Sequence, residues 1–159
     1  MAITGFWHGG VTVSDMETSR NFYRHLLGLT QVSDRLVDEE SVLAVTHAQV
    51  AGVRVCMLQV PGEPVYVELI QYGDGAAARR ADHEPSTAGH GHLCFYVDDL
   101  RSMWRDLQAA GVESVSDGPV DLSERIAGTW CIYLRDPDGY LIELFQGPRY
   151  PQRTPIEGE

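Results

Sequence analysis

The chain carries one pattern twice, and this internal repeat restricts the folds that it can adopt. Residues 8–15 (HGGVTVSD) and 92–99 (HLCFYVDD) both begin with histidine, followed by valine five positions later and aspartate seven positions later. Each half also contains an apolar, strand-like segment with a glutamate near its start, at 67–71 (VELIQ) and 142–146 (IELFQ). The repeat predicts two copies of one module, each with a histidine and a glutamate in equivalent positions.

The first half is predicted to have the element order β-α-β-β-β. Residues 5–13 form the first strand, and Ser14 to Glu17 match the Ser-x-x-Glu capping box that opens a helix. Apolar residues at helical spacing follow, and Gly28 stands where a left-handed helix end belongs. Further strands are expected at about 30–37, 49–60 and 64–72.

The second half repeats this order. A strand is predicted at 90–97, and the helix after it has one apolar face and ends at Gly111. The turn at 136–139 (DPDG) is typical of a hairpin. Further strands are expected at about 112–117, 126–135 and 139–147.

The predicted fold class is therefore α+β, with two tandem βαβββ modules in a single domain at 1–147. Module 1 spans about 1–74 and module 2 about 89–147. Residues 73–88 are rich in Gly, Ala, Pro and charge and lack an apolar period, which indicates a linker. The tail at 148–159 contains several prolines and is expected to be extended or disordered.

Composition excludes several classes of function. The net charge of −11 argues against a nucleic-acid surface. All 12 basic residues are arginine, so lysine Schiff-base chemistry is excluded. No apolar run is long enough to span a membrane and no secretion signal is visible, so a cytoplasmic protein is expected. Three cysteines (Cys56, Cys94 and Cys131) lie in strand-like stretches and are predicted to be reduced, buried thiols.

The two repeated glutamates stand on strand faces that otherwise look buried. Glu68 shares its face with Tyr66 and Ile70, and Glu143 shares its face with neighbouring apolar residues of its own strand. A buried carboxylate must be protonated, ion-paired or bound to a metal. A solvent-facing glutamate is the simpler explanation for either residue alone. The repeat of both residue types favours a divalent metal site formed by His8, Glu68, His92 and Glu143.

His90 competes with His92 for the ligand position in the second half. The two residues are expected on the same side of one strand, so His90 could be a ligand or a base beside the metal. Alignment of the modules pairs His92 with His8 and His90 with Phe6. We therefore assign the ligand to His92.

Four segments (8–23, 67–72, 91–100 and 135–145) resemble the vicinal oxygen chelate (VOC) superfamily, which includes glyoxalase I, methylmalonyl-CoA epimerase, extradiol dioxygenases and the bleomycin resistance proteins. The resemblance implies a cup-shaped mixed sheet made by the two modules, and commonly a homodimer. It also implies one metal ion, held by two modules of the same chain or of partner chains. His8, Glu68, His92 and Glu143 match the four ligand positions, and this ligand set is closest to that of glyoxalase I.

The resemblance implies a lyase or isomerase. Two imidazoles and two carboxylates suit one divalent ion of Ni, Co, Zn, Mn or Fe. A small-molecule substrate would bind through two vicinal oxygens, and proton abstraction would give an enediolate. Glu143 or Glu68 is the candidate base. Glyoxalase-type isomerisation and acyl-CoA epimerisation both remain open.

Two alternatives come from the same superfamily. Tyr133 lies ten residues before Glu143, and this position resembles that of the catalytic tyrosine in extradiol dioxygenases. Those enzymes, however, have three metal ligands and an acid–base histidine upstream of the second-module ligand. The position that matches this histidine lies near Ala77 here, so core packing is the favoured role of Tyr133. The other alternative is a non-catalytic ligand-binding protein of the bleomycin-resistance kind.

The substrate is only broadly indicated. A set of residues on the ligand-bearing faces (Phe6, Tyr66, Cys94 and Tyr96) is expected to shape a partly apolar pocket. Arg79 and Arg80 could hold a carboxylate or phosphate of a glutathione or coenzyme A adduct, although a solvated linker is the simpler role. Residues 38–48 are expected to form a loop over the cup that carries specificity.

Overall fold

The protein is described by a computed structural model that places residues 2–75 and 84–149. The chain forms two compact units. Unit 1 consists of Met1–Ala88 together with Asp136–Tyr140, and unit 2 consists of Gly89–Arg135 together with Leu141–Glu159. Arg79, Arg80, Ala77 and most of the predicted tail lie outside the described residues.

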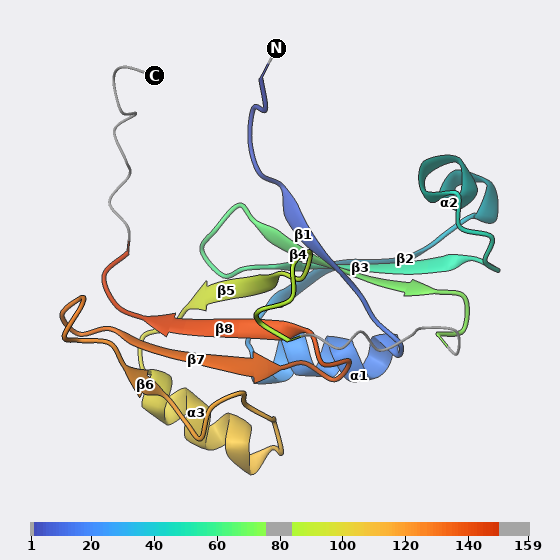
Figure 1. The fold of residues 1–159 in the computed structure, drawn as a ribbon. Coiled ribbons are helices and arrows are strands. Elements are labelled where there is room, and N and C mark those ends of the chain that lie inside the picture. The colour runs from blue at the N-terminus through green and yellow to red at the C-terminus, as the bar shows by residue number, and fades with distance from the viewer. Residues whose placement is uncertain (1, 76–83, 150–159) are drawn as a thin grey trace. The chain divides into compact units, whose positions relative to one another are not determined.

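Unit 1 contains a four-stranded mixed sheet in the order β1-β4-β3-β2 (Figure 1). The first strand pairs with the last in parallel, and the other pairs are antiparallel. Helix α1 continues into a π-helical turn, η1, and helix α2 lies between β2 and β3 in sequence. The elements of this unit are β1 (His8–Thr12), α1 (Met16–Asn21), η1 (Phe22–Leu26), β2 (Thr30–Val37), α2 (Glu39–Thr46), β3 (Val53–Gln59) and β4 (Tyr66–Tyr72).

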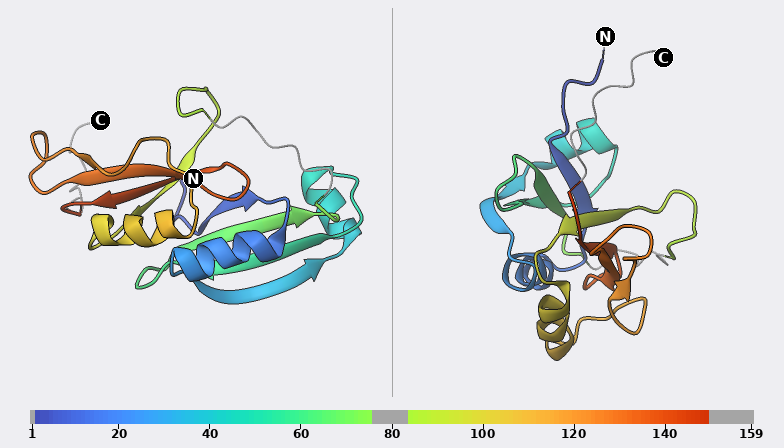
Figure 2. Two further views of the ribbon diagram at one scale, coloured as in Figure 1. Left: turned by 90° about the horizontal axis from the view of Figure 1, so that it is seen from below. Right: turned by 90° about the vertical axis from the view of Figure 1, so that its left-hand side faces the viewer.

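Unit 2 repeats this topology in the order β5-β8-β7-β6, again with the first strand parallel to the strand beside it. Its elements are β5 (His92–Tyr96), α3 (Leu100–Ala109), β6 (Val120–Asp121), β7 (Trp130–Arg135) and β8 (Leu141–Gln146). Within each unit one helix packs on the sheet, α1 on β4 and β3, and α3 on β8 (Figure 2). The predicted α+β class with two βαβββ modules is confirmed.

The two sheet-packing helices start in the same way. Asp15 and Asp99 are the N-caps, and their side chains accept from the backbone N–H three residues later, at 2.7 and 2.9 Å. A glutamine of the last strand then accepts the first N–H of the helix: Gln71 from Met16 at 2.6 Å, and Gln146 from Leu100 at 2.8 Å. These bonds satisfy N–H groups that have no partner inside a helix.

The capping box predicted from Ser14 to Glu17 is wrong. The N-cap is Asp15, and Ser14 instead donates through its backbone N–H, at 2.9 Å, and its hydroxyl to the Asp138 carboxylate. Asp138 lies in the turn that unit 1 includes, beside Asp136, whose carboxylate accepts from the buried Tyr23 hydroxyl at 2.9 Å. A partner 124 residues away in the chain therefore overrides the local capping pattern.

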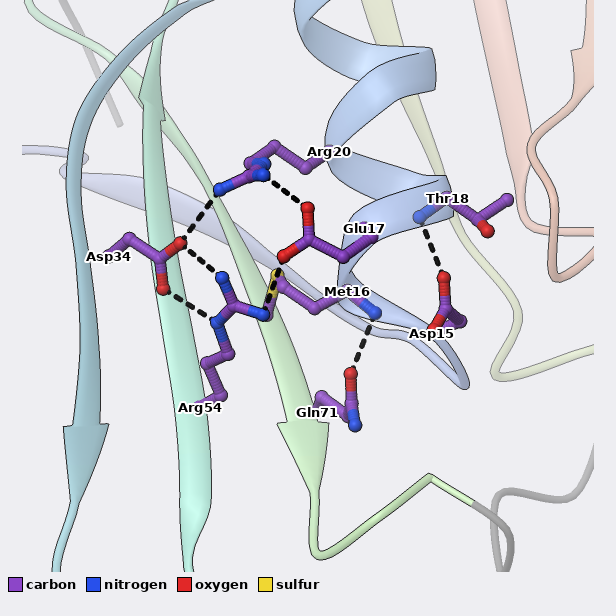
Figure 3. Close-up of polar contacts among 8 residues, drawn as sticks. All are labelled: Asp15, Met16, Glu17, Thr18, Arg20, Asp34, Arg54 and Gln71. Atoms are coloured by element: carbon purple, nitrogen blue, oxygen red, sulfur yellow. Dashed lines mark hydrogen bonds and ion pairs between the residues drawn. The ribbon is translucent and has the colours of Figure 1, made fainter.

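Glu17 belongs to a network of charged side chains that joins α1 to β2 and β3 (Figure 3). Arg54 donates twice to Asp34, at 2.8 and 2.6 Å, and once to Glu17, at 2.8 Å. Arg20 adds bonds to Asp34, at 3.1 Å, and to Glu17. The hydrogen bond from Arg54, opposed in part by burial, holds the pKa of Asp34 below its ordinary value. The network joins the helix to strands β2 and β3 of the sheet.

The last strand of each unit has one face toward the helix and an opposite face that carries the glutamate. In β4, Val67 and Leu69 are buried, and in β8, Ile142 and Leu144 are buried. Glu68 and Glu143 alternate with these residues, and their side chains are 21% and 16% exposed. The glutamates are therefore half-buried, on the side of each sheet opposite the helix.

Several predicted boundaries differ from the structure. The segment 38–48, which was expected to be a loop, contains helix α2 (Glu39–Thr46): Asp38 caps it, His47 ends it with a left-handed φ of 57°, and Val42 packs on Val53 and Val55 of β3. The strand expected at 112–117 is reduced to one bridge at Ser114, and the short β6 was not predicted. Strands β1, β3 and β7 start later than expected, at His8, Val53 and Trp130.

The cysteine prediction is right only in part. All three thiols are free, and Cys56 is buried as expected. Cys94 is exposed and Cys131 is half-buried, because both point to the glutamate-bearing side of their sheet. No helix among the described residues has the length and apolar character needed to cross a membrane.

Candidate metal centre

In unit 1, His8 and Glu68 form a close pair. Strands β1 and β4 run parallel with Gly10 opposite Glu68, so the histidine two residues earlier lies on the same face as the glutamate. His8 Nε2 is 3.2 Å from Glu68 Oε2. His8 Nδ1 is buried without a hydrogen-bond partner among the described residues, and the Trp7 ring meets the imidazole edge-on at 4.6 Å.

In unit 2, His92 and Glu143 form the equivalent pair. Cys94 lies opposite Glu143 in the parallel pairing of β5 and β8, which is the register seen for Gly10 and Glu68. His92 Nε2 is 2.9 Å from Glu143 Oε2. The module alignment made from the sequence therefore corresponds to the strand register, and His92 meets the glutamate in this unit.

The donor atoms of each pair fit a shared metal ion. Two ligands at about 2.1 Å from one ion and at right angles to each other lie about 3.0 Å apart. The observed separations of 3.2 and 2.9 Å bracket that value, and both histidines present the same nitrogen. The same distances also suit a charge-assisted hydrogen bond between imidazolium and carboxylate. The chemistry of the donors thus permits a metal.

A complete site is not present within one unit. Across residues 2–75 and 84–149, no three His, Cys, Asp or Glu side chains gather in a way that could hold a metal ion. Each unit brings one histidine and one glutamate together.

The Glu143 pair is surrounded by further hydrogen-bond donors. The Tyr133 hydroxyl donates to Glu143 Oε2 at 3.1 Å and lies 3.3 Å from His92 Nε2. The Cys131 thiol donates to Glu143 Oε1 at 3.1 Å, and the Cys94 thiol also hydrogen-bonds to this carboxylate. Burial, reinforced by the charge of Glu143, raises the pKa of Tyr133 and of Cys131 to about 12. Both groups are therefore protonated donors at neutral pH.

The contacts of Tyr133 with this pair correct the role expected for it. Its ring is half-buried, but its hydroxyl points at the His92 and Glu143 pair, and the ring meets that of His92 edge-on at 5.1 Å. Core packing alone does not account for these contacts. The sequence carried one signal for them: on a strand paired with β8, a tyrosine in the position opposite Glu143 must share its face.

Residues 5–144 match the sequence profile of the Glyoxalase/Bleomycin resistance protein/Dioxygenase superfamily. The chain belongs to this superfamily. Its relatives include a virulence protein of Salmonella typhimurium, 28% identical over 92% of this chain and 86% of the relative. The lactoylglutathione lyase of Pseudomonas putida is 28% identical over 89% of this chain and 84% of that enzyme. The lactoylglutathione lyase of Schizosaccharomyces pombe is 29% identical, and the match covers 86% of this chain but only 45% of the yeast enzyme.

Solved structures show the same superfamily fold. A glyoxalase family protein from Bacillus cereus superposes with a TM-score of 0.76 at 19% identity, over 92% of this chain and 95% of that protein. The trypanothione-dependent glyoxalase I of Leishmania major superposes with a TM-score of 0.65 at 19% identity, over 91% of this chain and 87% of the enzyme. At these identities the likeness concerns the fold alone.

The residues expected to shape a pocket are distributed unevenly. Cys94 contacts Glu143, and Tyr66 packs against the apolar cluster of β3 and α2. Phe6 precedes β1 and is largely exposed, and Tyr96 is exposed at the end of β5 with its ring edge-on to Phe145. Of these four residues, Cys94 has a hydrogen bond to a proposed ligand, Glu143.

Proposed function

We propose that this superfamily member is a divalent-metal-dependent enzyme of the lyase or isomerase type, with His8, Glu68, His92 and Glu143 as its metal ligands. One observation carries the proposal: each unit places a histidine Nε2 and a glutamate Oε2 side by side, 3.2 and 2.9 Å apart, at the same register of a parallel strand pair. A surface ion pair formed by chance has no reason to recur with the same partners at equivalent positions.

The donor set suits one ion of Ni, Co, Zn, Mn or Fe in the divalent state. Such an ion, when bound, polarises a substrate carbonyl or hydroxyl and acidifies the neighbouring C–H bond. The imidazoles would hold it as neutral ligands, and the two carboxylates would balance its charge. One of the two carboxylates, which are both partly shielded from water, would take the substrate proton.

The relatives favour a glyoxalase-type substrate. Two of them bear the name lactoylglutathione lyase. We therefore take a small molecule with vicinal oxygens, such as the hemithioacetal of glutathione, as the first substrate to test. Epimerisation of a coenzyme A thioester requires the same proton abstraction and is the second.

Tyr133 favours one other candidate function, extradiol ring cleavage. Its hydroxyl contacts both His92 and Glu143, which is where a proton donor for a ring-cleaving reaction would be needed. Glu68 argues against this function, because as a fourth protein ligand beside His8 it would occupy a coordination position that dioxygen needs. Isomerisation remains the better-supported reaction.

Activity assays on metal-reconstituted protein distinguish these functions. Turnover of the hemithioacetal of methylglyoxal and glutathione, or epimerisation of methylmalonyl-CoA, would support the proposal. Cleavage of catechol alone would assign the protein to the ring-cleaving class. Full activity in metal-free protein would contradict the mechanism, and failure to bind metal would place the chain with the ligand-binding members of the superfamily.

We also propose a homodimer. The segment before β1 exposes three apolar side chains, Ile3, Phe6 and Trp7, at 93%, 69% and 64%. Several largely exposed apolar side chains within five residues of the chain favour a protein–protein contact there. Light scattering of the wild type and of a Phe6→Ser, Trp7→Ser variant tests this: we expect the mass of two chains for the first and of one chain for the second, and a wild-type monomer would contradict the proposal.

A further inference from the structure

The turn between β7 and β8 belongs to unit 1, although both of these strands belong to unit 2. This β7–β8 turn spans Asp136–Tyr140, between the end of β7 at Arg135 and the start of β8 at Leu141. Strand β8 carries Glu143, and β7 carries Tyr133, which hydrogen-bonds to it. Contacts that hold the turn therefore act where the two strands that bear these groups are joined.

Two carboxylates of the turn bind to side chains from the start of the chain. The Tyr23 hydroxyl donates to Asp136 Oδ2 at 2.9 Å, and the two residues are only 0% and 4% exposed. Ser14 donates to Asp138 through its backbone N–H, at 2.9 Å, and through its hydroxyl. Burial, reinforced by the charge of Asp136, raises the pKa of Tyr23, so its hydroxyl is a proton donor at neutral pH. Because a buried polar group without a partner is costly, these bonds favour one position of the turn on unit 1.

The Asp136 carboxylate also fixes the shape of the turn. Its Oδ1 accepts from the backbone N–H of Asp138, at 2.9 Å, and from that of Tyr140, at 2.7 Å. The backbone N–H of Asp136 donates to the Tyr140 carbonyl at 2.9 Å. Strand β8 begins at the next residue. One carboxylate thus connects the Tyr23 hydroxyl to the start of the strand that carries Glu143.

Tyr23 reaches the turn from a π-helical segment. Helix α1 passes into η1 (Phe22–Leu26), and the Leu27 N–H donates to the Phe22 carbonyl at 3.0 Å. Such turns are rare and occur frequently at functional sites. The corresponding helix of the second module is α-helical throughout Leu100–Ala109. The irregular segment is therefore specific to the first module.

The residues that form these bonds are also specific to one direction of the repeat. Alignment of the modules gives the counterparts Leu107 for Tyr23, Asp98 for Ser14 and Pro61 for Asp136. A leucine or an ionised aspartate offers no side-chain donor, and proline offers no side-chain acceptor. The hold on the β7–β8 turn is therefore not a by-product of the repeated fold.

We propose that Tyr23 and Ser14 are positioning residues for Glu143: they hold the β7–β8 turn on unit 1 and thereby fix the start of the strand that carries this ligand. A metal ion binds more tightly where its ligands are already in place, because binding then does not have to order them. Residues of the first module thus control metal binding by a ligand of the second. The effect on metal binding rests on the proposed metal-dependent function, whereas the hold on the turn does not.

Amide hydrogen exchange tests the hold on the turn. We would compare the metal-free wild type with the double variant Tyr23→Phe, Ser14→Ala, which removes both hydroxyls and keeps the aromatic ring. Exchange of the backbone N–H groups at 139–146 is expected to become about tenfold faster, and each single variant should show part of this effect. Asp34→Asn is the matched control, because it removes charged hydrogen bonds within unit 1 that do not involve the turn. Unchanged exchange in the double variant, or equally fast exchange in the control, would overturn the hold on the turn.

Metal affinity tests the consequence for the proposed site. We would titrate the same metal-free proteins with Co²⁺ and follow the absorption of the bound ion. The double variant is expected to bind Co²⁺ about tenfold more weakly, whereas Asp34→Asn should bind it like the wild type. Ser14→Thr keeps a hydroxyl at its position and should retain both the exchange rates and the affinity of the wild type.

The two measurements separate the possible failures. Faster exchange at 139–146 together with wild-type Co²⁺ affinity in the double variant would overturn the positioning role. An equal loss of affinity in Asp34→Asn would overturn it as well, because the loss would then follow from lower stability in general. Failure of the wild type to bind Co²⁺ would instead overturn the proposed function, and the exchange rates would still decide whether Tyr23 and Ser14 hold the turn.

Discussion

The two modules of this chain agree in their backbones and differ in their side chains. Both have the same strand order, the same aspartate N-cap, the same glutamine bond to the helix start and the same histidine–glutamate pair. Around that pair, module 2 places two thiols and a phenol, and module 1 places valine, methionine and glycine. The shared backbone sets the positions of the histidine and the glutamate in each module, and the unshared side chains set which hydrogen bonds each glutamate accepts.

The largest expected effect comes from removing a histidine of either pair. His92→Ala should abolish metal binding and turnover, because it leaves Glu143 without its nitrogen partner. His8→Ala should do the same, because the intact pair of the other module is not a complete site. Metal content and hemithioacetal turnover of both variants measure this. If one variant kept its metal, the two modules would not contribute equally to a single site.

A smaller effect is expected at the charged network, which ties α1 to the sheet in module 1. Asp34→Asn should lower the free energy of unfolding by about 1–2 kcal/mol at pH 7, because it removes a bidentate bond from Arg54. The pKa of Asp34 is lowered in the folded protein, so this stabilisation is present above the ordinary value of 3.8 and is lost as pH falls through the folded value.

Urea unfolding of the wild type and Asp34→Asn between pH 7 and pH 3 checks this dependence. The two curves should converge toward the acid end. A difference that stays constant with pH would show that the carboxylate charge is not the source of the stabilisation. Ser33→Ala, at the neighbouring position of β2, serves as the control.

The smallest effect is expected from replacing either of the two glutamines that accept a hydrogen bond from the start of a helix. Gln71→Ala and Gln146→Ala should each lower the free energy of unfolding by about 1 kcal/mol, because each leaves one helical N–H without its acceptor. Thermal unfolding monitored by circular dichroism measures both. Equal losses in the free energy of unfolding would support the equivalence of the modules. A loss in only one of the two variants would limit that equivalence to the backbone.

The two modules could be predicted from the sequence because their elements depend on local patterns. The order of strands and helices follows from hydrophobic periodicity, and both helix-ending glycines, Gly28 and Gly111, have the left-handed φ values of 80° and 82° that their position requires. The pairing of each histidine with its glutamate followed from aligning the halves, since equivalent offsets give equivalent registers.

What the sequence missed depends on partners that are distant in the chain. Ser14 looked like a helix cap, but Asp138 binds it from 124 residues away. Tyr133 looked like a core residue, and only the pairing of β7 with β8 shows that its hydroxyl reaches Glu143. Helix α2 was expected to be a loop because its apolar pattern is weak; Val42 holds it to β3 by tertiary packing. In each case a long-range contact decided a locally ambiguous pattern.

Elemental analysis of purified protein determines whether the repeated histidine–glutamate pairs hold one divalent metal ion. We would compare the wild type with His8→Ala, which changes one pair, and Glu143→Ala, which changes the other. We expect close to one equivalent of a transition metal in the wild type and almost none in either variant. A wild type without metal after reconstitution, or variants that retain the ion, would contradict it.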